Sequence, residues 1–171
     1  MNTLLKKILL AIFTMALLSL AALQWTPNTS APDVTFTTIE GKKITMTGLE
    51  GKVVLVNFWA TNCLSCIKEM PALSDIYRRY HQRGLEVIAV AMPDDPPARV
   101  LNYVRHQNLP FPVMHDGFAE ITKEFGHVDL TPTTFIFDKQ GQRLQRTIGT
   151  LDFVKLDQLL NTKLSNMGAV K

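Results

Sequence analysis

The sequence predicts an α/β domain in which helices flank a central mixed sheet. Two nearly continuous apolar segments, 53–59 and 85–92, are typical of strands that are covered on both faces. Between them, segment 64–83 repeats its apolar residues at intervals of three and four, as an amphipathic helix does. Together they predict a β-α-β unit with a right-handed crossover. Further along, strands at 133–137 and 143–148 surround a turn and should pair antiparallel.

The remaining elements extend this core on both sides. Segments 34–39 and 43–47 surround a Glu-Gly-Lys turn and predict an extra N-terminal β-hairpin. Pro71 should kink the long helix, and Asp116 should cap a later one. Three shorter helices are predicted after the second buried strand, around 100–104, at 118–125 and at 152–164.

Length and composition limit the number of domains and the class of partner. A chain of 171 residues with 46% apolar and 19% charged residues has enough apolar material for one core, so one globular domain is expected. The formal charge of +3 falls to +1 from Gln24 onward, because Lys6 and Lys7 supply the difference. A domain so balanced lacks the basic face of a nucleic-acid-binding protein, and nucleic acid is excluded as a partner.

The N-terminus has the pattern of a targeting segment. Lys6 and Lys7 precede segment 8–23, in which only two of the 16 residues are polar. The segment is apolar on every face, unlike a core helix, and its length lies between a signal-peptide core and the roughly 20 residues of a membrane span. An uncleaved anchor is favoured because the segment continues past a small-residue motif at 19–21, and a cleaved signal peptide is the alternative.

Four parts follow from this pattern. Residues 1–23 form the anchor or signal peptide, 24–32 a linker of Pro, Asn, Thr and Ser character, 33–164 the folded domain and 165–171 a tail. Because the two lysines stay inside, the folded domain is expected outside the cytoplasmic membrane.

The chain has only two cysteines, Cys63 and Cys66, which excludes a framework of several structural disulfides. They stand where a buried strand ends and a helix begins. At a helix N-terminus, free backbone N–H groups and the helix dipole stabilise a thiolate on Cys63, and Cys66, one turn on, can resolve a mixed disulfide. No second cysteine or histidine pair supports a zinc site, and a structural disulfide across two residues would contribute little. Reversible thiol-disulfide exchange is the favoured interpretation.

Four ordered motifs add a family resemblance. They are Val56-Asn57-Phe58-Trp59-Ala60-Thr61-Asn62-Cys63-Leu64-Ser65-Cys66, Glu69-Met70-Pro71-Ala72-Leu73, Leu109-Pro110-Phe111-Pro112-Val113 and Thr131-Pro132-Thr133-Thr134-Phe135, the last followed by Asp138 and Gly141. Over about residues 33–164 the chain resembles the TlpA, ResA and CcmG group of membrane-linked thioredoxin-like proteins. The resemblance implies a thioredoxin-like fold with an extra N-terminal hairpin and a bacterial origin. It also implies a periplasmic domain, held by an anchor in the inner membrane or free in the periplasm after cleavage.

The resemblance also implies an activity and its partners. The activity is that of a protein-disulfide oxidoreductase without a cofactor, which reduces disulfides of specific exported proteins, such as those of cytochrome c maturation or metal-site assembly. A membrane electron donor of the thiol-reducing type would keep it reduced. In the family, the proline that matches Pro132 is cis and lies against the cysteine pair, so Thr131 and Pro132 should shape the edge where a substrate segment binds. Trp59 is expected beside the active site as a further substrate contact, with a plain core aromatic as the alternative.

Some positions depart from the family pattern. Asn62 and Ser65 precede the first and second cysteines, where they should tune the redox potential. Asn57 occupies the place of the buried Asp of cytosolic thioredoxins, and an amide cannot be a general base. Glu69 is then the nearest acid that could assist proton transfer from the second cysteine, with a solvated helix carboxylate as the alternative. Leu130 replaces a common glycine and should reshape the substrate groove.

A copper chaperone of the Sco type is the alternative function. Such proteins combine a cysteine pair with a distant histidine on a thioredoxin fold, and His127 follows Cys63 by 64 residues. Their cysteines, however, have a wider spacing than Cys63 and Cys66. The four histidines otherwise resemble scattered surface positions, so no metal ligand is predicted. A peroxidase of the peroxiredoxin type is less favoured still, because its peroxidatic cysteine usually stands alone in a Thr- and Pro-containing context.

Overall fold

The computed structural model describes residues 6–7, 9–15 and 29–165, and a five-stranded mixed sheet forms the core of the last range. The strand order is β5-β4-β3-β6-β7. The strands are β3 (Val53–Trp59), β4 (Leu85–Ala91), β5 (Val113–His115), β6 (Thr133–Phe137) and β7 (Arg143–Ile148). The helices are α2 (Leu64–Tyr80), α3 (Pro97–Gln107), α4 (Glu120–Glu124) and α5 (Phe153–Leu164), with 3₁₀ turns η1 (Thr47–Leu49) and η2 (His81–Arg83).

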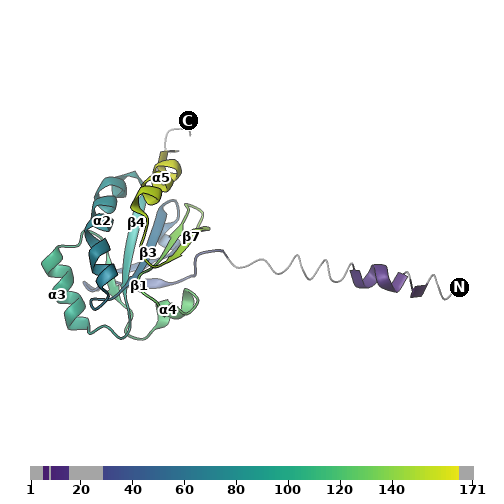
Figure 1. The fold of residues 1–171 in the computed structure, drawn as a ribbon, viewed down its shortest axis with the longest axis horizontal. Helices are drawn as coiled ribbons and strands as arrows, with labels where there is room; N and C mark the ends of the chain where they lie inside the picture. Colours follow the sequence, from purple (N-terminus) through teal and green to yellow (C-terminus); the bar gives the residue numbers. More distant parts are fainter. Residues whose placement is uncertain (1–5, 8, 16–28, 166–171) are drawn as a thin grey trace.

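Different elements cover the two faces of the sheet (Figure 1). Helices α2, α3 and α5 pack on one face, where they meet alternate residues of β3 and β4. The other face is covered by α4 and by a separate hairpin of β1 (Thr35–Thr37) and β2 (Lys43–Thr45). Every residue of β3 and β4 is buried, which explains why these two segments are so apolar. The predicted mixed sheet with flanking helices and an N-terminal hairpin is confirmed.

Strand register defines two ends of this sheet. β3 pairs in parallel with β4 and antiparallel with β6, and β6 pairs antiparallel with β7. The last residues of β5, β4 and β3 stand in register with one another, whereas the first residue of β6 pairs with Phe58, one residue before the end of β3, and with the last residue of β7. These residues form one end of the sheet. We call this the carboxyl end of the sheet, after the direction of β3. The opposite, amino end carries the turn between β6 and β7.

Most predicted elements occur with small shifts at their ends. β5 was not predicted, because three residues are too few to show a periodicity. Asp116 accepts hydrogen bonds from the backbone N–H groups of Ile121 and Thr122, at 3.1 and 2.7 Å, as its predicted capping role requires. Asp152 caps α5 in the same way, with bonds from the N–H groups of Val154 and Lys155 at 3.1 Å each.

The predicted targeting segment 8–23, the start of the linker and the tail beyond Ser165 lie largely outside the described residues. Residues 9–15 are helical, and their apolar side chains are exposed. In the described ranges, none of the helices has the length and apolar content needed to span a membrane.

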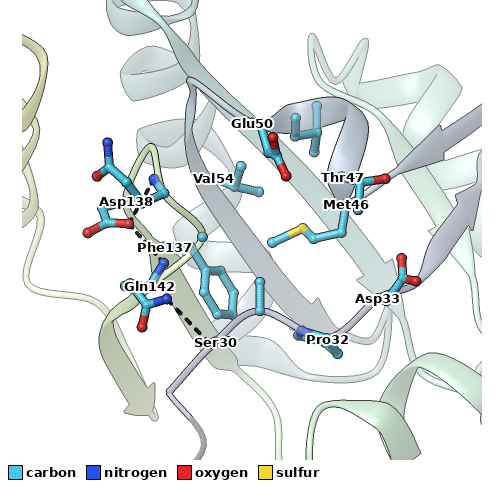
Figure 2. Close-up of a pocket in the computed structure, with 14 residues that line it drawn as sticks. Ser30, Pro32, Asp33, Met46, Thr47, Glu50, Val54, Phe137, Asp138 and Gln142 are labelled. Atoms are coloured by element: carbon cyan, nitrogen blue, oxygen red, sulfur yellow. Dashed lines mark hydrogen bonds between the residues drawn. The ribbon is translucent and has the colours of Figure 1, made fainter.

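The end of the predicted linker is part of the folded domain. Ser30 forms a β-bridge with Gln142, and the N–H of Ala31 donates to the carbonyl of Gly141 at 2.8 Å. These residues close a pocket of about 160 Å³ at the amino end of the sheet, lined by apolar side chains and by Asp33, Glu50 and Asp138 (Figure 2). The carboxylate of Asp138 binds N–H groups of its own turn. The chain therefore enters the domain at the amino end of the sheet.

At the carboxyl end, Asp95 holds the turn that connects β3 to α2. Its carboxylate accepts hydrogen bonds from the N–H and from the hydroxyl of Thr61, each at 2.6 Å. Asp95 is only 2% exposed, and its carbonyl accepts a hydrogen bond of 2.7 Å from Nε2 of His115 at the end of β5. One buried residue thus links the loops that follow β3 and β4 to the end of β5.

Asp95→Ala should lower the free energy of unfolding by about 3 kcal/mol, because each hydrogen bond to a charged group contributes about 1.5–3 kcal/mol. Asp94 is exposed, so Asp94→Ala is the matched control and should change stability by less than about 0.5 kcal/mol. Urea unfolding of the two variants measures the difference. Equal stability of the two variants would show that the hydrogen bonds of Asp95 do not stabilise the fold.

Candidate active site

The cysteine pair lies at the carboxyl end of the sheet, at the first turn of α2. Cys63 is the N-cap residue of this helix and forms a disulfide with Cys66, with their Cα atoms 5.3 Å apart. Sγ of Cys63 accepts a hydrogen bond from the N–H of Cys66 at 3.2 Å and lies 3.4 Å from Oγ of Ser65. These contacts would stabilise a negative charge on Sγ of Cys63 in the reduced state.

The two sulfurs differ in accessibility. Cys63 is partly exposed, whereas Cys66 is 1% exposed and belongs to the core between the sheet and α2. An incoming thiolate or disulfide can therefore reach Cys63 but not Cys66. This arrangement suits an exchange in which one sulfur meets the partner and the other completes the reaction internally.

The other wall of the site is the loop before β6. Thr131–Pro132 is a cis peptide bond, as the resemblance implied, and Thr131 lines the same open groove of about 900 Å³ as Cys63. Pro132 is buried, and its carbonyl accepts a hydrogen bond from the N–H of Gly149 at 2.8 Å. Within residues 29–165, no hydrogen bond engages the backbone of Thr131. A strand-like segment could therefore pair with it beside the disulfide.

Glu69 lies at the floor of this groove, one turn after Cys66. It is 7% exposed, so the alternative of a solvated helix carboxylate is wrong. Its Oε1 accepts a hydrogen bond from the N–H of Leu151, and its Oε2 is buried with no partner in the described part of the chain. Burial raises the pKa of Glu69, and the bond from Leu151 offsets part of that effect. A carboxyl group of this kind holds its proton to a higher pH than an exposed glutamate does.

Two further predicted positions lie beneath the groove rather than on it. Trp59 is 0% exposed, packs 5.3 Å from the ring of Tyr103 between centroids, and is not among the residues that line the groove. Its predicted contact with substrate is therefore not supported, because β3 is covered on both faces. Asn57 is buried in the same strand, and its Nδ2 donates to Oγ1 of Thr134 at 3.0 Å.

Two of the predicted positions in the loop between α4 and β6 are exposed. Leu130, next to Thr131, is 61% exposed. His127 is exposed, has a positive φ of 55° and does not line the groove. Over the described ranges, no three His, Cys, Asp or Glu side chains gather closely enough to hold a metal ion.

Three residues that support or line the site were not predicted. Asp95 supports the turn before Cys63 from the loop that follows β4. Thr150 and Phe153, which precede and begin α5, line the groove opposite α2. The signal for Asp95 was its place directly after a buried parallel strand, where loops converge on the carboxyl end of a sheet.

Comparisons with known proteins agree with this geometry. Residues 27–142 match the AhpC/TSA family. Over 130 residues, the chain is 39% identical to the thiol-disulfide oxidoreductase ResA of Bacillus thuringiensis subsp. konkukian, covering 76% of this chain and 74% of that protein.

Two solved structures are similar over most of their length. A protein from Neisseria meningitidis, described as a thioredoxin, has a TM-score of 0.75 and 35% identity, covering 84% of this chain and 95% of its own. A thiol:disulfide interchange protein of the thioredoxin family from Chlorobium tepidum TLS has a TM-score of 0.73 and 28% identity, covering 81% and 98%. The chain therefore belongs to the AhpC/TSA family of thioredoxin-like proteins and is a thiol-disulfide oxidoreductase with a Cys63-x-x-Cys66 pair.

Proposed function

We propose that this protein reduces disulfides of specific exported proteins, outside the cytoplasmic membrane, through attack by Cys63 and resolution by Cys66. The observation that carries the proposal is the asymmetry of the pair. Cys63 is partly exposed at a helix N-terminus and accepts the N–H of Cys66, whereas Cys66 is buried behind it. The accessible sulfur is thus the one whose thiolate is stabilised.

In the proposed reaction, the Cys63 thiolate attacks one sulfur of the substrate disulfide and forms a mixed disulfide, while the other substrate sulfur leaves as a thiolate and takes up a proton. Cys66 then loses its proton and attacks Sγ of Cys63, which releases the second substrate thiol. The substrate gains two electrons, and the pair ends as the disulfide described above. A membrane electron donor of the thiol-reducing type returns the pair to the dithiol.

Glu69 is proposed to accept the proton of Cys66 in the resolving step. It follows Cys66 by three residues, a spacing that places two side chains on the same face of a helix. Its buried Oε2 is unpartnered within the described residues, and its pKa is raised by burial. A base whose pKa lies nearer to neutral transfers protons more effectively than an ordinary carboxylate.

Thr131 and Pro132 are proposed to form the docking edge for substrate. The free backbone of Thr131 faces the groove that holds Cys63, and the buried Pro132 is tied by its carbonyl to Gly149. Main-chain pairing would hold a substrate segment extended across the disulfide, as in other cases of strand addition.

The location is proposed from the sequence pattern of the N-terminus. Lys6, Lys7 and the apolar segment 8–23 favour an anchor in the bacterial inner membrane with the folded domain in the periplasm. Partners in cytochrome c maturation or metal-site assembly are the proposed substrates, as for the family that the sequence resembles.

The two cysteine variants should behave differently. Cys63→Ser should abolish turnover of a protein disulfide, whereas Cys66→Ser should accumulate a mixed disulfide with the substrate because the resolving sulfur is missing. The chain has only two cysteines, so a trapped adduct can form only through Cys63. Non-reducing electrophoresis, with and without dithiothreitol, measures the adduct. Full turnover by the Cys63→Ser variant would contradict the proposed attack by Cys63.

Glu69→Gln keeps an acceptor for the N–H of Leu151 but cannot take a proton, so resolution should slow on the order of 10²-fold at neutral pH. Wild-type stability should fall as the pH rises through the raised pKa of Glu69, since the folded state then loses a proton that it binds more tightly than the unfolded chain. The Glu69→Gln variant should lack this pH-dependent decline in stability.

Stopped-flow exchange and urea unfolding across acid to neutral pH measure both effects. The exposed Glu124 on α4 provides the matched control Glu124→Gln, which should change neither. A Glu69→Gln protein that resolves at the wild-type rate would remove Glu69 from the mechanism.

The proposed location is tested in the native bacterium. The protein should sediment with membranes, and Cys63 should react in intact spheroplasts with a thiol reagent that cannot cross the membrane. Removing residues 1–28 should move the domain to the cytoplasmic fraction, since the lysines and the apolar segment are then gone. Recovery of the full chain in the soluble cytoplasm would contradict export.

A further inference from the structure

The large apolar side chains that residues 29–165 expose gather at one end of the domain. Of these residues, five are exposed by more than half: Leu64 (69%), Phe118 (91%), Leu130 (61%), Ile148 (56%) and Val154 (69%). All five lie in segments that leave or enter the carboxyl end of the sheet. We call these five side chains the apolar rim.

Strand register places each member of the rim. Leu64 and Phe118 follow β3 and β5, whose last residues, Trp59 and His115, both stand in register with Ala91 of β4. Leu130 precedes β6. Thr133, the first residue of β6, pairs with Ile148, the last of β7. Val154 then stands in the first turn of α5, directly after β7.

Two members of the rim lie next to residues of the groove that holds the accessible sulfur. Leu64 is the chain neighbour of Cys63, and Leu130 is the chain neighbour of Thr131 on the opposite wall of the groove. Phe118 and Ile148 extend the apolar surface to the two edge strands. With neighbouring strands about 4.8 Å apart, four intervals separate β5 from β7, so the rim spans roughly 19 Å.

The exposed charge within the groove is positive. Among its lining residues, Lys68 is the exposed charged side chain, whereas the carboxyl group of Glu69 is buried. A lysine or arginine beside an incoming cysteine would therefore meet a like charge, and an apolar or acidic neighbour would not.

We propose that the apolar rim selects, as substrate, an extended protein segment with large apolar side chains on both sides of its cysteine and no basic residue next to it. The inference rests on the proposed function and adds a substrate class to it. Continuity with the disulfide groove favours this occupant, since Leu64 lines the groove beside Cys63 and Leu130 adjoins Thr131 on its other wall. About six extended residues cover roughly 19 Å, which matches a short segment. Exposed apolar surface of this kind marks interaction sites.

Eight-residue peptides test the selection. Each peptide carries one cysteine linked to a thionitrobenzoate reporter. The positions on both sides of the cysteine hold Leu and Phe in the first peptide, Ser in the second and Lys in the third. The reduced protein should release the reporter from the Leu and Phe peptide about 10-fold faster than from the Ser peptide, because burial of one large apolar side chain is worth about that factor. The Lys peptide should be slowest.

Phe118→Ser and Ile148→Thr should each reduce the preference for the apolar peptide, whereas Gln140→Ser, at the opposite end of the sheet, should leave it unchanged. The small disulfide dithiobis-nitrobenzoate carries no peptide segment that could bind along the rim, so its reaction rate should be the same in all three variants. Urea unfolding checks that the surface changes leave the fold intact.

Three outcomes would overturn the inference. If the peptides react equally while the small disulfide reacts normally, the rim has no selective role, although the proposed function survives. If neither reacts with the reduced protein, the proposed function fails as well. The third outcome is that phosphatidylglycerol vesicles bind the wild type and protect its Cys63 from thiol reagents, but do not bind the Phe118→Ser variant. The rim then faces a lipid surface instead of a protein segment.

Discussion

The burial of β3 on both faces determines the rest of the structure. All seven of its residues are buried, and it pairs with β4 on one side and with β6 on the other. A central strand of this kind cannot shift its register without moving its whole apolar set, so its carboxyl end is fixed in space. Because β6 runs in the opposite direction, the residue before its cis proline meets the residues that follow β3. Cys63 and Thr131, far apart in the sequence, thus share one groove.

Two buried carboxyl groups flank this groove and differ in how completely they are paired. Both oxygens of Asp95 accept hydrogen bonds from Thr61, so both are paired and the residue stabilises the fold. Glu69 binds one backbone N–H through Oε1, and its Oε2 is left buried and unpartnered within the described part of the chain. Burial without full pairing raises the pKa of Glu69, which leaves it able to exchange a proton.

Local pattern was sufficient to predict most of the fold. The apolar strands and the amphipathic α2 follow from periodicity, and the capping of α4 follows from Asp116 just before it. The cis conformation of Pro132 was predicted from the family resemblance. Periodicity could not reveal β5, which has three residues, nor the complete burial of Trp59, which depends on α3 packing over β3. The bond between Asp95 and Thr61 joins two loops, and no spacing within either loop encodes it.

The entry point of the chain into the domain sets the orientation of the reactive end. Residues 29–31 pair with the turn between β6 and β7, at the end of the sheet opposite Cys63. Seven residues of β3 lie between the two ends, a length of roughly 23 Å. A domain held by its N-terminus therefore presents its reactive sulfur away from the point of attachment, toward freely diffusing partners. In the proposed function, the membrane electron donor would therefore act at the end of the domain that lies farther from this attachment.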